Sequence, residues 1–303
     1  MPKRLPRSRT LKGDPRIAYY DTAKPSGEGG AGVAGEPPIV LLHGVTLRSE
    51  DWENVFPRLA TRYRVIAYDA RGHGKSGRAA SYALDDLVSD LVRVLGEIAK
   101  APAILIGHSV GGATALVAAA REPSLVKGLV LEDPWLSLYR DTKWRTPYFT
   151  KLRSALDQRE DPRSFVRAIS ALPLPEPGPR GERTVGEVRG FYSVDRVAGY
   201  YKDVDAAVVD QVVTRDEAGS VEIAAAPSKV KCPVLLLAAG TGSALAESEA
   251  DRLASTITDV KLMKFPGVGH RIHGLRPEPF LEALEPFLRR VRTTASPAPP
   301  RAG

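Results

Sequence analysis

Short apolar runs alternate with amphipathic stretches along most of the chain. Mostly apolar runs predict strands, since a strand covered on both faces shows no polar alternation. These runs are residues 38–42, 63–68, 103–106, 126–131, 232–239 and 260–265. Helices are expected between and after them, at 50–62, 83–99, 112–120, 246–257 and 277–292. In 83–99, for example, leucine, valine and isoleucine recur at helical spacing. Strands that alternate with helices predict a mostly parallel sheet with helices on both faces.

Two short strands at 8–12 and 16–21, joined by the turn Gly13-Asp14-Pro15, bring the expected sheet to eight strands. The alternation stops after residue 133 and resumes near 229. The expected domains are an α/β core of residues 1–133 and 229–293, an inserted cap of residues 134–228, and a disordered tail of residues 294–303. The cap is expected to be mostly helical, because it is rich in aromatic residues and holds no strong strand run.

A glycine-flanked serine stands at the junction of a predicted strand and a predicted helix. The sequence G-H-S-V-G places Gly107 and Gly111 two residues on either side of Ser109. A serine at the apex of such a turn has a strained backbone, which leaves no room for side chains at the flanking positions. The helix start also leaves backbone N–H groups free to face an oxyanion. The alternative is a glycine turn whose serine caps the helix, but the strand before it and the helix after it favour a nucleophile.

Composition narrows the classes of function. The formal net charge of +7 lies largely in the first twelve residues, which are basic and carry no acid, so we expect no nucleic-acid partner. A single cysteine, Cys232, excludes an internal disulfide, and no secretory leader or membrane-spanning run is expected. The glycine-rich loop at 24–37 lacks a phosphate-binding motif, and H-E-x-x-H and C-x-x-C are absent. The expectation is a cytoplasmic protein without metal or cofactor that acts on a small molecule.

Four motifs together resemble the α/β-hydrolase fold family from about residue 8 to 292. They are H-G at 43–44, D-x-R-G-H-G-x-S at 69–76, G-H-S-V-G at 107–111 and G-V-G-H at 267–270, in the order that the family has them. The resemblance implies that the insertion is the family's cap domain. It also implies a serine hydrolase with a Ser–acid–His triad.

A serine needs a base to take its proton, and histidine is the base tuned near neutral pH. His270 follows the last predicted strand and is the expected base, whereas His273 is expected to be a solvated loop residue. The family resemblance gives His43 and Gly44 a structural role in the oxyanion loop. It makes the backbone N–H groups of Val45 and Val110 the expected oxyanion hole.

The acid of the triad is less clear from the sequence. Relatives of this fold commonly carry an aspartate after the seventh strand, but here residues 240–246 hold no carboxylate. Some relatives carry the acid after the sixth strand, where this chain reads Glu132-Asp133. Glu132 is the first choice and Asp133 the alternative, and a site with no working acid stays open.

The serine limits the chemistry to acyl transfer. The first hypothesis is a carboxylesterase-like hydrolase that cleaves an apolar or aromatic ester, a lactone or a thioester. The second is a carbon–carbon bond hydrolase or a perhydrolase with the same triad. The third, from a different class, is a ligand-binding or otherwise non-hydrolytic member of the fold, which the missing seventh-strand acid keeps open.

Overall fold

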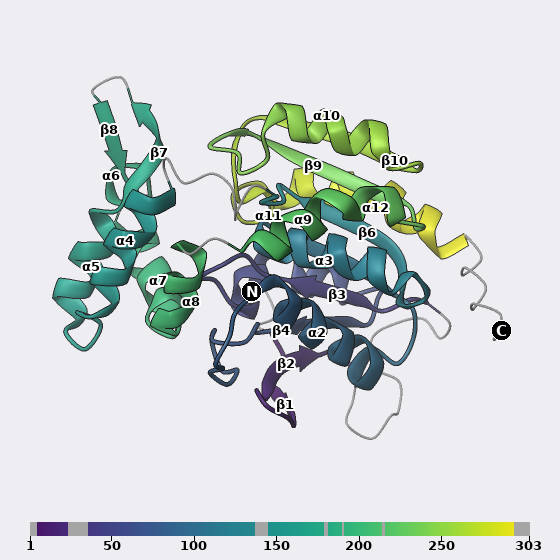
Figure 1. The fold of residues 1–303 in the computed structure, drawn as a ribbon, viewed down its shortest axis with the longest axis horizontal. Helices are drawn as coiled ribbons and strands as arrows, with labels where there is room; N and C mark the ends of the chain where they lie inside the picture. The colour runs from purple at the N-terminus through teal and green to yellow at the C-terminus, as the bar shows by residue number, and fades with distance from the viewer. Residues whose placement is uncertain are drawn as a thin grey trace.

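The computed structural model of this chain describes residues 5–23, 36–136, 145–178, 181–189, 191–213 and 216–293. Most of the predicted glycine-rich loop and the whole predicted tail at 294–303 lie outside these ranges. The central feature is an eight-stranded sheet in the order β1-β2-β4-β3-β5-β6-β9-β10 (Figure 1). Its strands are β1 (Arg9–Leu11), β2 (Ile17–Asp21), β3 (Ile39–Leu42), β4 (Val65–Tyr68), β5 (Ala103–His108), β6 (Val126–Glu132), β9 (Val234–Thr241) and β10 (Val260–Gly269).

The sheet is mixed but mostly parallel, as the alternation of strands and helices predicts. β1 pairs antiparallel with β2, and β2 with β4, whereas β4, β3, β5, β6, β9 and β10 are parallel. Parallel strands end at the same edge of the sheet. The ends of β3, β5, β6 and β10, where the motifs lie, are therefore brought together.

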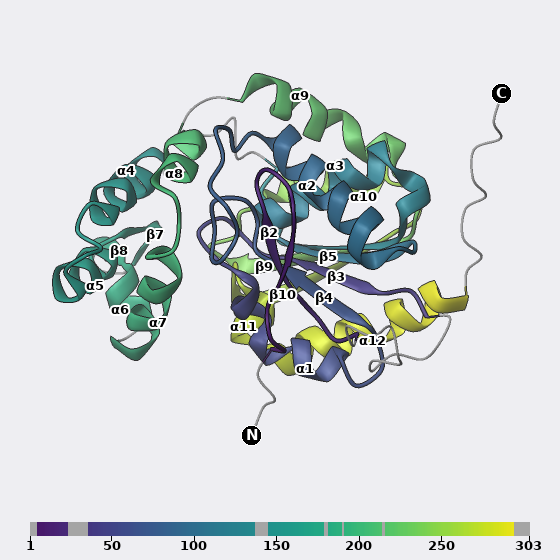
Figure 2. The same cartoon turned by 90° about the horizontal axis from the view of Figure 1, so that it is seen from below.

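Helices cover both faces of this sheet (Figure 2). One face carries α2 (Leu84–Val94), which continues as a π-helical turn (Leu95–Ala99), together with α3 (Val110–Arg121), α9 (Glu217–Ala225) and α10 (Glu247–Thr256). The other face carries a 3₁₀ helix (η1, Ser49–Asn54), α1 (Phe56–Leu59), α11 (Ile272–Leu275) and α12 (Pro277–Thr293). The predicted helix at 50–62 is thus a 3₁₀ turn followed by one short α-helix.

Two apolar cores result, one on each face, because successive residues of a strand point to opposite sides. In β5, Leu105 belongs to the core under α2 and α3, whereas Ile104 and Ile106 belong to the core under α12. All three side chains are fully buried. This strict alternation also decides where the side chains at the strand ends point.

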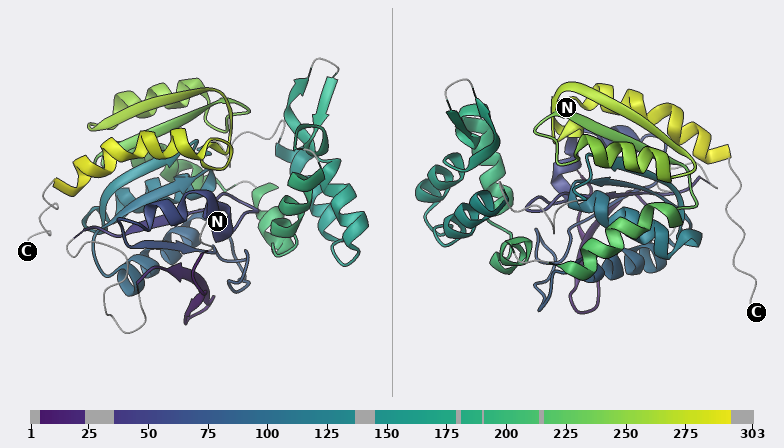
Figure 3. Two further views of the ribbon diagram at one scale, coloured as in Figure 1. Left: turned by 180° about the vertical axis from the view of Figure 1, so that it is seen from behind. Right: turned by 45° about the horizontal axis from the view of Figure 1, so that its top comes forward.

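The insertion after β6 forms a separate layer to one side of the sheet (Figure 3). It contains α4 (Arg145–Leu156), α5 (Pro162–Ser170), α6 (Val185–Arg189), α7 (Phe191–Tyr201) and α8 (Ala206–Val213). A hairpin of β7 (Pro173–Gly178) and β8 (Gly181–Thr184) was not expected from the sequence. It includes the proline-rich run, whose prolines disfavour helix and are compatible with extended chain.

The end of the predicted cap lies against the core. α9 and the following 3₁₀ turn (η4, Ala226–Lys229) pack on α3, next to the sheet. Residues 217–229 therefore cover the core, although the sequence pattern placed all of 134–228 in the cap.

Candidate active site

Ser109 stands at a strained turn between β5 and α3. Its backbone angles are φ 56° and ψ −119°, a region that residues other than glycine rarely adopt. The chain around it is tightly packed, since a Cβ on Gly111 would lie 2.5 Å from the carbonyl oxygen of Leu42. The side chain is 2% exposed. This is the strand–turn–helix geometry that the sequence predicts for a nucleophile.

The structure brings His270 to Asp133. Nδ1–H of His270 donates to Oδ2 of Asp133 over 2.6 Å, and the histidine is one-third exposed while the aspartate is fully buried. On its other side, the His270 ring lies 4.5 Å from the ring of His108, the residue next to Ser109. A hydrogen bond from His108 Nε2–H to the carbonyl oxygen of His270 also joins the two segments, over 3.2 Å. The expected base thus lies between the nucleophile turn and a carboxylate.

Glu132 does not contact His270, which corrects the first choice of acid. It points to the opposite side of β6 from Asp133 and accepts hydrogen bonds from the backbone N–H and Nδ1–H of His273, both within about 2.9 Å. The chain also turns into the left-handed region at Asp133, with φ 43°. That turn moves the aspartate carboxylate toward the loop that carries His270.

β9 and the loop that follows it supply hydrogen-bond donors to Asp133. Asp133 accepts from the backbone N–H of Ala239 (3.0 Å), the backbone N–H of Ala244 (2.8 Å) and the hydroxyl of Ser243 (2.6 Å). With His270, the carboxylate has four hydrogen-bond donors, so each of its oxygens accepts two hydrogen bonds. The cost of burying the Asp133 carboxylate is therefore offset by hydrogen bonds from β9 and the loop that follows it.

The turn after β3 passes directly over the nucleophile. A Cβ on Gly44 would lie 3.2 Å from Cβ of Ser109 and 2.8 Å from Nδ1 of His108. Val45 follows this glycine, and Val110 opens α3, where an N–H has no acceptor within the helix. Among the hydrogen bonds of the described residues, none uses the N–H of Val45 or Val110. Both predicted oxyanion donors are thus free beside Ser109.

Two neutral histidines hold this turn against the next loop. Nδ1–H of His43 donates to the carbonyl oxygen of Gly44, and its Nε2 accepts from the N–H of Ala70. His73 lies on that next loop and accepts from the N–H of Thr46 through its own Nε2. A ring nitrogen that accepts an N–H is unprotonated. Accordingly, burial lowers the pKa of His43 and lowers that of His73 to about 3.

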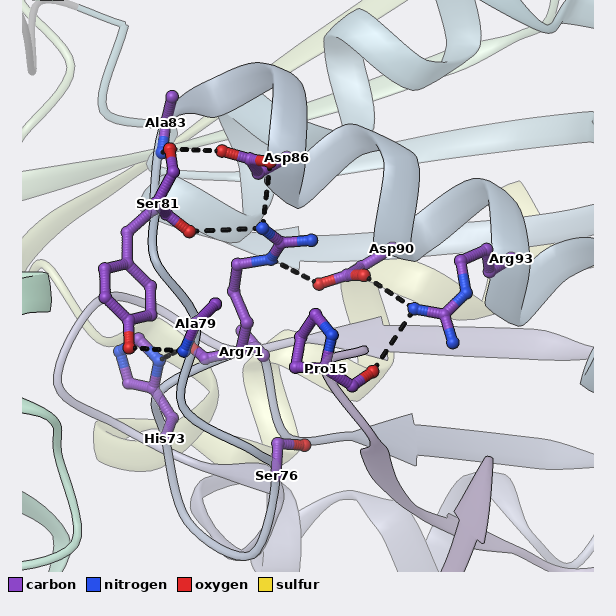
Figure 4. Close-up of polar contacts among 12 residues, drawn as sticks. Pro15, Arg71, His73, Ser76, Ala79, Ser81, Ala83, Asp86, Asp90 and Arg93 are labelled. Atoms are coloured by element: carbon purple, nitrogen blue, oxygen red, sulfur yellow. Dashed lines mark hydrogen bonds and ion pairs between the residues drawn. The ribbon is translucent and has the colours of Figure 1, made fainter. Parts of the chain in front are cut away.

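Figure 4 shows how the loop that carries His73 is fixed to α2. Arg71 pairs with Asp90 over 2.7 Å and with Asp86 over 2.9 Å, and it donates to the carbonyl oxygen of Ser81. The Arg71 side chain is 9% exposed and that of Asp90 is 2% exposed, so the pair with Asp90 is largely shielded from water and salt. The oxyanion turn is therefore supported, through His73, by a helix of the core.

An apolar pocket lies beside the two free N–H groups. Its walls come from β3 and its turn, the loop after β4, α2, the start of α3 and the cap helix α8. The lining residues are Leu42, His43, Gly44, Val45, Tyr68, Ala70, His73, Tyr82, Leu87, Val110, Gly111, Thr114, Val208, Gln211 and Val212. None of them is an aspartate, glutamate, lysine or arginine, and both histidines are neutral. Within the described residues, the pocket therefore favours an uncharged group.

The cap is anchored at the rim of this pocket. Between α7 and α8, the carboxylate of Asp205 accepts from the hydroxyl of Tyr82 (2.6 Å), and its N–H donates to the carbonyl oxygen of Gly72 (2.7 Å). Asp203 forms an ion pair with Arg48, close after the oxyanion turn. These contacts fix the start of α8 over the pocket.

A strained serine, a histidine–carboxylate pair and free backbone N–H groups at the carboxyl edge of a mostly parallel sheet define a hydrolase fold. The family model described as alpha/beta hydrolase fold matches residues 37–277, and the chain belongs to that family. A 2-(acetamidomethylene)succinate hydrolase from Mesorhizobium japonicum is 26% identical over 258 residues, which are 83% of this chain and 88% of that protein. The mouse sn-1-specific diacylglycerol lipase ABHD11 is 24% identical over 273 residues, 83% and 81% of the two chains.

Solved structures agree in fold. The enol-lactonase from Burkholderia xenovorans LB400 superposes with a TM-score of 0.68 at 19% identity, over 91% of this chain and 97% of that one. A hydrolase from Pseudomonas aeruginosa PA01 also gives a TM-score of 0.68, at 21% identity over 93% and 98%. Such identities show the fold, and the substrate has to be argued from the pocket.

In the part of the chain that the structure describes, no three histidine, cysteine, aspartate or glutamate side chains are grouped so that they could hold a metal ion. None of the helices in the described ranges combines the length and the hydropathy needed to cross a membrane.

Proposed function

We propose that this protein is a serine hydrolase that cleaves an uncharged carboxylic ester, lactone or thioester through an acyl-enzyme on Ser109. The observation that carries the proposal is the 2.6 Å hydrogen bond from His270 to the buried Asp133, beside a serine in a strained turn. A histidine oriented by a carboxylate is the base that a serine nucleophile requires. A carboxylate directly after β6 that orients this histidine also supports hydrolysis over a purely ligand-binding function, which the sequence left open because residues 240–246 hold no carboxylate.

In the proposed first half-reaction, Oγ of Ser109 attacks the acyl carbonyl carbon and its proton passes to Nε2 of His270. Asp133 stabilises the imidazolium that forms, through the bond to Nδ1–H. The N–H groups of Val45 and Val110 receive the oxyanion, and each such donor contributes about 3 kcal/mol in precedents. When the tetrahedral intermediate collapses, the bond from the acyl carbon to the leaving oxygen, or to the leaving sulfur of a thioester, breaks and His270 gives its proton to that atom.

The second half-reaction repeats these steps with water. Water gives a proton to His270 and its oxygen attacks the acyl carbon, and the same two N–H groups receive the charge. The bond to Ser109 then breaks, its oxygen regains the proton from His270, and the carboxylic acid leaves. Each step conserves protons without a cofactor.

The pocket supports an uncharged acyl group of modest polarity. Valine, leucine and tyrosine side chains dominate its walls, and a carboxylate placed there would find no cation among the described lining residues. The charged succinate derivative named for the Mesorhizobium relative is therefore a poor expectation for this chain. We favour esters whose acyl part is apolar or aromatic.

Turnover of p-nitrophenyl acetate and butyrate by wild type and Ser109→Ala tests the proposal. If deacylation is slower than acylation, we expect a burst of nitrophenol equal to the enzyme concentration. Whichever step is slower, wild type should turn over the esters at least about a thousandfold faster than Ser109→Ala. Intact-mass spectrometry of the quenched wild type should show the added acyl group, and Ser109→Ala should show none. If wild type turns over no faster than Ser109→Ala, ester hydrolysis is the wrong assignment.

A further inference from the structure

A second histidine–carboxylate cluster lies directly beneath the candidate site and is not used in the mechanism above. Glu132, Asp51 and His273 are each 0% exposed, and they come from β6, η1 and α11, three segments far apart in the sequence. Nδ1–H of His273 donates to Glu132 over 2.8 Å, and Nε2–H donates to Asp51 over 3.0 Å. Arg271 forms an ion pair with the other oxygen of Asp51 at 2.6 Å.

The geometry of this cluster defines its charge. Both ring nitrogens of His273 face carboxylate oxygens, and a carboxylate can only accept, so the ring is an imidazolium. Burial opposes that charge, but the two carboxylates raise the pKa of His273 to about 9. Burial would also raise the pKa of Asp51, yet Arg271 and His273 hold it below its ordinary value. The two acids, Glu132 and Asp51, are thus matched in charge by the two cations, His273 and Arg271.

The cluster is built from the sequence neighbours of the triad. Glu132 precedes Asp133, and His108, which precedes Ser109, pairs in register with Glu132 on the neighbouring strand. Because residues paired in register project from the same face of a sheet, the side chains of Glu132 and His108 lie on one face. There the His108 ring lies 5.3 Å from the ring of His273.

His273 also restrains the loop of His270. Its backbone N–H donates to Oε1 of Glu132 over 2.8 Å, and it lies three residues after His270, whose carbonyl oxygen accepts from His108. The loop between the base and α11 is therefore fixed to β5 and β6 at two points. Trp52 closes the cluster, stacked on the His273 ring with centroids 4.0 Å apart.

We propose that His273 is a positioning residue: by bridging Glu132 and Asp51 it holds the loop that carries His270 in register with Asp133 and Ser109. Without the bridge, the loop keeps only the Arg271–Asp51 ion pair as its connection to η1, and it loses one of its two hydrogen-bond connections to Glu132 at the end of β6. A misplacement of about 1 Å in a catalytic group costs about a hundredfold in rate. Since the pocket residues are not involved, substrate binding should be unaffected.

The inference rests on the proposed function, and it also predicts a pH effect. The charged and titratable groups that face His273 are Glu132 from β6, Asp51 from η1, Arg271 and His270 from the loop before α11, and His108 from β5. As the pH rises through about 9, the imidazolium loses a proton and with it the hydrogen bond to one carboxylate. The turnover number should then fall in wild type. Without the charge of Glu132 the same fall should begin at lower pH.

The test compares wild type with His273→Gln, Glu132→Gln and Asp51→Asn, with Glu247→Gln as control, since Glu247 is an exposed acid paired with Lys264. With p-nitrophenyl butyrate and titrated active sites, kcat of the three cluster variants should fall by about 10–100-fold with KM within twofold. The alkaline limb of kcat should move to lower pH in Glu132→Gln and Asp51→Asn. The control should match wild type throughout. Three cluster variants are compared so that, if one of them fails to fold, the other two still test the proposal.

A spectroscopic readout separates this inference from the proposed function. In ¹⁵N-histidine NMR spectra of the Ser109→Ala background, His273 should stay an imidazolium to about pH 9, and in Glu132→Gln it should lose its proton at lower pH. The low-field Nδ1 proton of His270 should broaden or shift in that variant, whether or not the protein hydrolyses esters. Wild-type kcat with an unchanged pH profile, or an unaltered His270 proton signal, in the folded cluster variants would overturn the positioning role.

Discussion

Asp133→Asn is the substitution that tests the candidate site most directly. The carboxylate accepts one hydrogen bond from His270 and three more, from the N–H groups of Ala239 and Ala244 and the hydroxyl of Ser243. An asparagine keeps one oxygen, and its NH₂ group must replace either Oδ1, which faces Ala239, or Oδ2, which faces Ala244. Either orientation directs a donor at a backbone donor, so one buried N–H loses its acceptor.

The two costs of this substitution differ in size. A buried donor left without an acceptor costs about 1–3 kcal/mol of folding free energy. Loss of the carboxylate also removes the counter-charge of the His270 imidazolium and the acceptor that fixes its tautomer, and comparable changes lower kcat by about 10⁴. That factor equals about 5.4 kcal/mol of transition-state free energy. Catalysis should therefore suffer more than stability.

The assay measures both quantities on the same preparations. Steady-state kcat for p-nitrophenyl butyrate is corrected for active fraction, and unfolding in guanidinium chloride gives the free energy of unfolding. Ser243→Ala, which removes one neutral donor and leaves the charge, serves as the matched control and should lose less than about tenfold in kcat. If folded Asp133→Asn keeps more than a tenth of wild-type kcat, Asp133 is not the acid of the site and the reasoning from its hydrogen bonds is wrong.

Two further predictions concern the oxyanion turn and the buried histidine. In Gly44→Ala the new methyl group would lie 2.8 Å from His108 Nδ1, so the turn must move away from Ser109 and kcat should fall by about 10²–10³-fold. The control is Gly199→Ala, whose methyl group meets open space on α7. Equal activities of the two variants would contradict the placement of the turn. For His273, the pKa of about 9 against an ordinary 6.5 corresponds to about 3 kcal/mol of stability. Because the folded-state pKa of His273 is raised, this stability is fully present below pH 6.5 and is lost as the pH rises through about 9. The free energy of unfolding from denaturant titrations at pH 6 and pH 10 should therefore differ by that amount in wild type, and by much less in His273→Gln.

Much of the fold follows from short-range pattern. Six apolar runs and the two short strands at 8–12 and 16–21 predicted the eight strands of the main sheet to within a few residues, because a strand buried on both faces must be built from apolar residues. The turn at Ser109 was predictable because glycine is required on both sides by contacts with neighbouring chain. His270 was predictable from its position after the last strand, where the ends of parallel strands converge.

The choice between two adjacent acids depended on a feature that no pattern encodes. Glu132 and Asp133 are chemically similar, and their roles are separated by strand alternation and by the left-handed backbone at Asp133. His273 was expected in solvent, but it is fully buried, because its two acids come from positions 132 and 51. The signal that sequence reasoning missed was a second histidine three residues after His270, together with two adjacent acids, one for each histidine.

The location of the proposed acid, Asp133, directly after β6 changes which positions of the chain are free to vary during evolution. A loop that carries the acid must keep one residue type, whereas β9 and the loop after it support Asp133 through the backbone N–H groups of Ala239 and Ala244. Any residue except proline provides an N–H, so substitutions at these two positions should be tolerated as long as the loop keeps its path. The position that must keep its residue type is Asp133, directly before the cap. The first residues of the cap can therefore diverge only as far as they leave the Asp133 carboxylate in place.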